Sequence, residues 1–211
     1  MSFQLRFGPD AVRVLEDELA FQGHFQVRRL TLQYRGFAGG WVEPVTREVF
    51  ERGDAVGVLP YEPVSDSLVL VEQFRPGALG DSKSPWMLEL VAGIVEPGES
   101  DESVVHREAM EEAGCSLSTL ESIASFYPSS GACTEHVRLY CGRVTEAGIG
   151  GVHGLAEEGE DILVHAVPRQ TALELLAANE IPNGHTLIAL QWLAIHGDRL
   201  RERWLESPQG E

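Results

Sequence analysis

Basic residues and cysteines are scarce in this chain of 211 residues, and each scarcity argues against a class of protein. Sixteen lysine and arginine residues stand against 33 aspartate and glutamate residues, which gives a formal net charge of -17. Binding to nucleic acid needs a basic surface that neutralises phosphates, so we expect no nucleic-acid partner. The three cysteines, Cys115, Cys133 and Cys141, match neither a zinc site nor a disulfide framework. We expect them to be reduced thiols in a cytosolic protein.

Long apolar runs are absent as well. No stretch of about 18 apolar residues occurs, so we expect no membrane-spanning helix. The first ten residues also lack the apolar stretch of a signal peptide. Apolar residues nevertheless make up 43% of the chain, which is enough to build a core. These features together predict a soluble, cytoplasmic protein without a membrane partner.

Strand-like segments dominate the chain, with helices inserted between them. A hairpin is expected from residues 25–35 and 43–51, which the turn GFAGG joins. Further strands are expected at 54–61, 67–75, 86–95, 122–128, 136–144 and 161–167, and helices at 169–180 and 185–204. This order predicts an α/β or α+β protein with a mixed sheet. We divide the chain into an N-terminal β-region (1–52), a main domain (53–206) and a tail (207–211).

One stretch, GIVEPGESDESVVHREAMEEAGC, covers residues 93–115 and holds seven acidic residues against one arginine. Ser100 is expected to cap a helix over about residues 101–113, and Gly114 to end it. Apolar residues recur at every fourth position of this helix and form a stripe that can pack on a sheet: Val105, Ala109 and Ala113.

Glu108, Glu111 and Glu112 fall on the arc beside that stripe, which directs them along the sheet rather than into water. Two carboxylates about 4 Å apart repel by roughly 4 kcal/mol at an effective dielectric constant near 20. The simple alternative is a solvated acidic face. A divalent cation such as Mg²⁺ removes the repulsion, because it takes oxygen ligands and is commonly shared with substrate phosphates. The crowding therefore predicts a metal site that makes an anionic substrate acceptable to an acidic protein.

The spacing of this stretch resembles the Nudix box, G-x5-E-x7-R-E-U-x-E-E-x-G-U, where U is a bulky aliphatic residue. All seven fixed residues of the pattern are present: Gly93, Glu99, Arg107, Glu108, Glu111, Glu112 and Gly114. Ala109 and Cys115 occupy two U positions. Segments outside the box, such as TREVFERGDAVGVLPY, PWMLELVAGIVEPGE and VHGLAEEGEDILVHAV, resemble the bacterial ADP-ribose pyrophosphatases of this family over about residues 20–206.

The resemblance implies a Nudix α/β/α sandwich with an N-terminal antiparallel β-region. It implies hydrolysis of ADP-ribose to AMP and ribose 5-phosphate with two or three Mg²⁺ ions, for which Mn²⁺ can substitute. The implied metal ligands are the carbonyl of Ala92 and the carboxylates of Glu108, Glu112 and Glu160. The implied catalytic residues are Glu158 as general base, Glu111, which ligates metal or orients a ligand, and Arg107, which orients carboxylates.

The resemblance also implies substrate contacts at eight positions: His24, Phe25, Arg47, Glu48, Arg75, Ile94, Ser129 and Glu135. The first two would stack on the adenine, and the next two would hold the base and phosphates. Arg75 would neutralise phosphate, and the remaining three would line the ribose end. A homodimer is implied too, in which the N-terminal β-region swaps onto the partner.

Alternatives stay open on these residues. Ser130 stands where the subgroup usually has proline, so another nucleoside diphosphate sugar, such as GDP-mannose, is an alternative substrate. A non-catalytic Nudix domain that binds ADP-ribose as a sensor is an alternative of another class, although the intact box counts against it. The alternative for Arg75 and Arg107 is a surface position without a functional role. The alternative for the acidic loop at 153–162 is a solvated loop without one.

Overall fold

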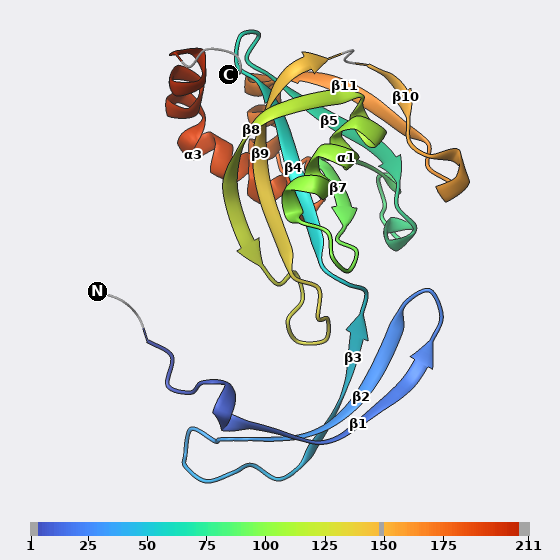
Figure 1. Cartoon of the computed structure of the whole chain (residues 1–211), viewed down its shortest axis with the longest axis vertical. Helices are drawn as coiled ribbons and strands as arrows, with labels where there is room; N and C mark the ends of the chain where they lie inside the picture. Colours follow the sequence, from blue (N-terminus) through green and yellow to red (C-terminus); the bar gives the residue numbers. More distant parts are fainter. Residues whose placement is uncertain (1–3, 148–149, 207–211) are drawn as a thin grey trace. The chain divides into compact units, whose positions relative to one another are not determined.

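The computed structural model describes residues 4–147 and 150–206, and the chain divides into two compact units (Figure 1). The first unit runs up to Gly53 and includes residues 127–135; the second holds residues 54–126 and those from His136 onward. The sequence-based division had placed residues 127–135 in the main domain. The expected tail, residues 207–211, lies outside the described residues.

The first unit contains a three-stranded antiparallel sheet in the order β1-β2-β3. Its strands are β1 (Val12–Gln22), β2 (Gln26–Tyr34) and β3 (Val45–Glu51), and the short 3-10 helix η1 (Pro9–Ala11) precedes them. The β2–β3 hairpin is the one that the sequence predicts. Strand β1 was not predicted from the sequence, because its acidic residues are poor strand formers. Cross-strand pairs hold them instead, such as Asp17 with Arg28 at 2.7 Å.

Residues 127–135 join the first unit through β3. The N–H of Phe50 donates to the carbonyl of Ala132 at 2.7 Å, and the Phe50 carbonyl accepts from the N–H of Thr134 at 3.1 Å. The strand therefore gains a partner that is about 80 residues away in sequence, which no local pattern predicts.

The second unit is built on an eight-stranded mixed sheet. Its main path is β10-β11-β5-β4-β9-β8, with β6 paired to β5 and β7 paired to β4. Only the β4–β9 pair is parallel among the strands that the structure describes. The strands are β4 (Ala55–Glu62), β5 (Ser67–Phe74), β6 (Trp86–Glu89), β7 (Val91–Ile94), β8 (Cys115–Phe126), β9 (Val137–Ala147), β10 (Gly151–His153) and β11 (Ile162–Pro168).

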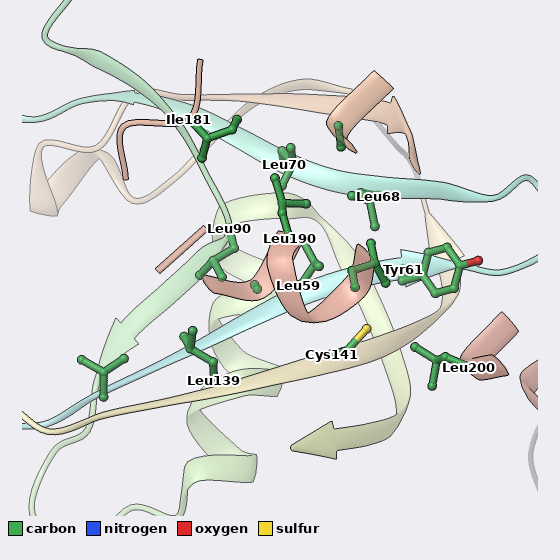
Figure 2. Packing of buried hydrophobic residues seen from close by; sticks show 14 of the residues in the cluster. Leu59, Tyr61, Leu68, Leu70, Leu90, Leu139, Cys141, Ile181, Leu190 and Leu200 are labelled. Atoms are coloured by element: carbon green, nitrogen blue, oxygen red, sulfur yellow. The ribbon is translucent and has the colours of Figure 1, made fainter. Parts of the chain in front are cut away.

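Helices cover both faces of this sheet (Figure 1). Helix α1 (Asp101–Ala113) packs on one face, and α2 (Arg169–Ala177) and α3 (Gly184–Glu206) pack on the other. Side chains of β4 alternate accordingly, with Val58 toward α1 and Leu59 toward α3. Figure 2 shows the hydrophobic core between the sheet and the helices α2 and α3, where leucines of β4, β5 and α3 gather. The expected α/β/α sandwich is confirmed.

Two expected strands have different bounds in the structure. The expected strand at 86–95 is interrupted at Leu90, so that β6 pairs with β5 while β7 pairs with β4. The expected strand at 122–128 starts already at Cys115, because β8 is an edge strand whose polar residues can face water. No helix among the described residues combines the length and the apolar character needed to cross a bilayer.

Candidate active site

Helix α1 begins and ends at the expected residues. The Ser100 hydroxyl accepts a hydrogen bond from the N–H of Ser103, and the Ser103 hydroxyl accepts one from the N–H of Ser100, each at 3.1 Å. This reciprocal cap satisfies N–H groups that the helix leaves free. Gly114 ends the helix in the left-handed region, with φ of 59°. The caps therefore fix where the glutamates of α1 lie along the sheet.

Glu108 lies against the backbone of Gly93 in β7. A Cβ atom at Gly93 would overlap the Glu108 carboxylate, so glycine is needed here for close approach. Burial raises the pKa of Glu108 to about 7; Arg107 opposes this shift, while the charges of Glu111 and Glu160 add to it. The contact between strand and helix thus holds a carboxylate in a place that disfavours its charge.

Glu112 is the most deeply buried acid of α1, with 3% of its surface exposed. It accepts one hydrogen bond, at 3.0 Å, from the N–H of Ala92. Burial, helped by the charges of Glu108 and Glu160, raises its pKa to about 8. Because the N–H and C=O of an extended residue project from the same edge of the strand, the Ala92 carbonyl projects toward the same side as Glu112.

Arg107 is bonded to three carboxylates around it. Its Nη1 atom donates to Glu108 Oε1 at 2.7 Å and to Glu111 Oε2 at 3.2 Å. Its Nη2 atom lies 3.5 Å from Glu99 Oε2, which also accepts from the N–H of Glu96 at 3.0 Å. Burial works against the charged guanidinium, but these acids outweigh it and raise the pKa of Arg107. The arrangement suits charge-assisted hydrogen bonds that orient carboxylates.

The acidic loop at 153–162 begins at the end of β10 and is hydrogen-bonded to α1. The N–H of Gly154 donates to the carbonyl of Glu111 at 3.2 Å. Glu160 accepts a hydrogen bond at 3.0 Å from a backbone N–H of its own loop, that of Leu155. The backbone of Glu158 belongs to the 3-10 helix η3 (Ala156–Glu158), and its side chain lies outside the part that the structure describes.

The donors gathered here are oxygen atoms, which hard divalent cations prefer. Among the described side chains, no three His, Cys, Asp or Glu residues are grouped closely enough to bind a metal ion. The carboxylates take hydrogen bonds from Arg107 and from backbone N–H groups instead. Burial and neighbouring carboxylates raise the pKa values of Glu108 and Glu112, and a cation would offset both effects. Their chemistry and the neighbouring Ala92 carbonyl therefore fit a divalent cation.

Arg75 pairs with a buried acid that the sequence analysis did not single out. Its Nε and Nη2 atoms both donate to Glu89 Oε2, at 2.9 and 2.7 Å. Burial opposes the charge of Arg75, but Glu89, Glu112 and Glu160 together raise its pKa. The available signal for Glu89 was its place as the lone acid within the apolar run WMLELVAGIV.

In the first unit, aromatic and charged side chains gather beside β3. The ring of Phe25 meets those of His24 and Phe50 edge-on, at 4.4 and 5.2 Å between centroids. Arg52, another residue missed from the sequence, lies 5.7 Å from the centre of the Phe25 ring. Its Nε is 3.4 Å from Glu135 Oε1 without hydrogen-bond geometry, and both atoms are buried without a hydrogen-bond partner among the described residues. Such atoms favour a polar partner that a ligand can supply.

Two other expected substrate residues, Arg47 and Glu48, lie on different faces of the first unit's sheet. Arg47 and Glu48 are successive residues of β3 and so project from opposite faces of the sheet. The first donates to the carbonyl of Thr46 at 2.8 Å, and the second pairs with Arg29 at 3.2 Å. Of two more expected contacts, Ser129 belongs to the turn of residues 129–133 in the first unit, and Ile94 ends β7 in the second unit.

Comparison with known proteins agrees with this geometry. A family model described as NUDIX domain matches residues 51–196. The chain is 41% identical over 198 residues to the ADP-ribose pyrophosphatase of Escherichia coli (strain K12), covering 94% of this chain and 95% of that protein. It is 30% identical over 187 residues to the GDP-mannose pyrophosphatase of Enterobacter sp. (strain 638), covering 88% and 96%. The crystal structure of an ADP compounds hydrolase has the same fold, with a TM-score of 0.65 at 20% identity over 93% of this chain and 99% of that chain. This chain therefore belongs to the Nudix family.

Proposed function

We propose that this protein hydrolyses the pyrophosphate bond of ADP-ribose and releases AMP and ribose 5-phosphate. The 41% identity to the Escherichia coli ADP-ribose pyrophosphatase carries the proposal, because it spans nearly the whole of both chains. The complete set of Arg107, Glu108 and Glu112 favours hydrolysis over mere binding, since loss of such groups is the simplest route to an inactive binding domain.

The residues that would hold metal are the Ala92 carbonyl and the carboxylates of Glu108, Glu112 and Glu160. Bound Mg²⁺, as two or three ions or with Mn²⁺ in its place, supplies positive charge to the pyrophosphate and lowers the pKa of a coordinated water. Arg107 would keep Glu108 and its neighbour Glu111 oriented by the hydrogen bonds described above. Glu111 would ligate metal or orient a ligand from this position.

Glu158 would be the general base that takes the proton from the attacking water. Its loop is attached to α1 through the bond from Gly154 to Glu111, which keeps it beside the acid helix. A group on a short loop can move to its working position when substrate binds. The proton would leave the water oxygen for the carboxylate as the new bond to phosphorus forms, and the bridging P–O bond would break so that the other phosphate leaves.

Substrate contacts are proposed for residues of both units. In the first unit, His24 and Phe25 would stack on the adenine, and Arg47 and Glu48 would hold the base and phosphates. Ser129 and Glu135 would line the ribose end. Arg52 joins this set, because its buried Nε lacks a hydrogen-bond partner among the described residues. In the second unit, Ile94 would contact the ribose end and Arg75 would neutralise phosphate.

A homodimer is proposed from the surface of β1. All eleven side chains of this strand are exposed, and they include five large apolar ones: Val12, Val14, Leu15, Leu19 and Phe21. Exposed apolar side chains gathered on one strand are typical of an interaction site. The N-terminal β-region would swap onto the partner subunit. Phe21→Glu should convert the dimer to a monomer in sedimentation analysis, and an unchanged mass would contradict this interface.

A substrate panel tests the activity. ADP-ribose with Mg²⁺ should give AMP and ribose 5-phosphate, with kcat/KM at least about tenfold above that of GDP-mannose. Preference for GDP-mannose would establish the second candidate, which the 30% identity to a GDP-mannose pyrophosphatase favours. Binding of ADP-ribose without turnover of any nucleotide sugar would indicate a sensor instead.

Glu158→Gln tests the base. The variant should bind ADP-ribose as well as wild type and lose turnover by about 10² to 10⁴-fold, the range for a general base. The adjacent Glu157→Gln is the matched control, because it removes the same charge from the same loop. Full rate in Glu158→Gln, or an equal loss in the control, would overturn the assignment.

A further inference from the structure

A chain of hydrogen bonds connects the first turn of α3 to Arg75. The Nδ2 amide of Asn183, just before α3, donates to Glu89 Oε1 at 3.0 Å. The other oxygen of Glu89 accepts both bonds from Arg75. Each carboxylate oxygen thus has its own donor group, which fixes the plane of the carboxylate and, through it, the guanidinium of Arg75.

The orientation of the Asn183 amide is determined by Thr186. The Oδ1 atom of Asn183 accepts hydrogen bonds from the N–H and the hydroxyl of Thr186, both at 3.0 Å. Because a backbone N–H can only donate, the oxygen of the amide must face it, and the NH₂ group is left for Glu89. The amide therefore cannot rotate without breaking its bonds on both sides.

The same turn holds the interruption between β6 and β7. The buried Thr186 hydroxyl accepts from the N–H of Leu90 at 2.9 Å. Leu90 is the residue between the two strands, one position after Glu89. The start of α3 therefore positions both the Leu90 backbone and the Glu89 carboxylate. These residues lie where the chain passes from β6, which pairs with β5, to β7, which pairs with β4.

The arrangement leaves one face of Arg75 available. Glu89 uses the Nε and Nη2 atoms, and the described residues provide no hydrogen-bond partner for Nη1. We propose that Asn183 is a positioning residue, which acts through Glu89 to direct the free Nη1 of Arg75 at a phosphate of the substrate. This inference rests on the proposed function for the identity of the substrate, while the relay itself is a property of the chain.

Asn183→Asp separates this role from helix capping. The aspartate keeps an oxygen for the two Thr186 donors, so the cap survives. It replaces the amide donor with a carboxylate oxygen that repels Glu89. We expect KM for ADP-ribose to rise about tenfold while kcat changes by less than about twofold, because a binding contact is misdirected. An unchanged KM would overturn the proposal.

The Arg75→Ala background shows whether the effect passes through Arg75. There, Asn183→Asp should change kcat/KM by less than about twofold, because residues that act in one network are not additive. An equal tenfold loss in both backgrounds would show that Asn183 acts by another route. Asp66→Asn, which weakens a distant ion-pair group, should leave KM unchanged and so controls for loss of stability.

A spectroscopic readout without substrate distinguishes failure of the relay from failure of the proposed function. In the ¹H–¹⁵N spectrum, the Nε–H signal of Arg75 is the one that Arg75→Lys removes. Asn183→Asp should shift this signal and speed its exchange with water, and leave that of Arg169 unmoved. An unmoved Arg75 signal would overturn the relay whatever the substrate, whereas a shifted signal in a protein inactive on ADP-ribose would overturn only the proposed function.

Discussion

Two groups of acids that are partly or fully buried in the second unit have opposite surroundings. Asp66 accepts hydrogen bonds from Arg169 Nε and Nη2, at 2.8 and 3.1 Å, and from the Tyr61 hydroxyl at 2.7 Å. Burial alone would raise the pKa of Asp66, but these bonds lower it. Glu112 has one backbone N–H and carboxylate neighbours, and burial raises its pKa to about 8.

The difference separates stability from function. A buried charge with matched partners is held in the folded state, and removal of one partner is strongly destabilising. Asp66 serves in this way, since it joins the turn after β4 to the helices on the far side of the sheet. The acids of α1 lack such matching, so a cation has a place among them. Asp66 therefore stabilises the folded chain, whereas Glu108 and Glu112 are suited to bind a cation.

The largest effect is expected for Glu112→Gln. Turnover should fall by on the order of 10³-fold, as when a group that stabilises transition-state charge is lost. The metal-free variant should be at least as stable as wild type, because a buried carboxyl with a raised pKa is replaced by a neutral amide. Steady-state rates and urea unfolding measure the two quantities. A clear loss of stability with full activity would place Glu112 in the same class as Asp66.

Gly93→Ala should act on Glu108 alone. The new methyl group overlaps the Glu108 carboxylate, so the acid must move away from β7. We expect kcat to fall about 10²-fold, since a displacement of about 1 Å at a catalytic group has this scale. Gly80→Ala, where a Cβ meets no atom within 4 Å, is the control. Wild-type rates in Gly93→Ala would show that the close contact is not needed.

Asp66→Asn should lower stability and leave turnover nearly unchanged, which is the reverse of the result expected for Glu112→Gln. The free energy of unfolding should drop by about 2 kcal/mol, because Arg169 loses one of its two charged partners in a half-buried place. Turnover should stay within about twofold of wild type, as Asp66 lies outside the proposed active site. Denaturant unfolding and rate measurements on one preparation test both statements. A large fall in kcat would show that Asp66 also serves catalysis, and would contradict the division between Asp66 and the acids of α1.

The smallest effect is expected from pH. The folded state holds protons on Glu108 and Glu112 more tightly than the unfolded state does, so their contribution to stability is present below about pH 4.5 and is lost as pH rises through about 7 and 8. Asp66 contributes oppositely, above its ordinary value of 3.8, and loses this contribution as pH falls through its lowered pKa.

Metal-free protein should therefore be less stable at about pH 8.5 than at about pH 5.5. Added Mg²⁺ should stabilise it more at the higher pH, because the ion binds deprotonated carboxylates. Melting temperatures with EDTA and with Mg²⁺ measure this. Equal stabilisation by Mg²⁺ at both pH values would separate metal binding from these two acids.

Helix α1 could be predicted from the sequence, whereas the contacts of Glu89 could not. The helix was predicted residue by residue because its cap, its apolar stripe and its glycine stop act between neighbours in the chain. Glu89 was missed because its partner Asn183 is 94 residues away. Strand β1 was missed for a similar reason, since its acidic residues become acceptable only beside the arginines of β2.

By itself the sequence determined the mixed α/β class, the helix at 101–113 and the family, because periodicity, capping and motif spacing are encoded locally; the sandwich followed from the family resemblance. Only the tertiary structure decided which acids are buried with a partner and which without. Burial depends on what packs above a residue, and the close approach of β7 to α1 at Gly93 places Glu108 out of water. The same packing sets Arg75 against Glu89, a pair that no spacing in the sequence predicts.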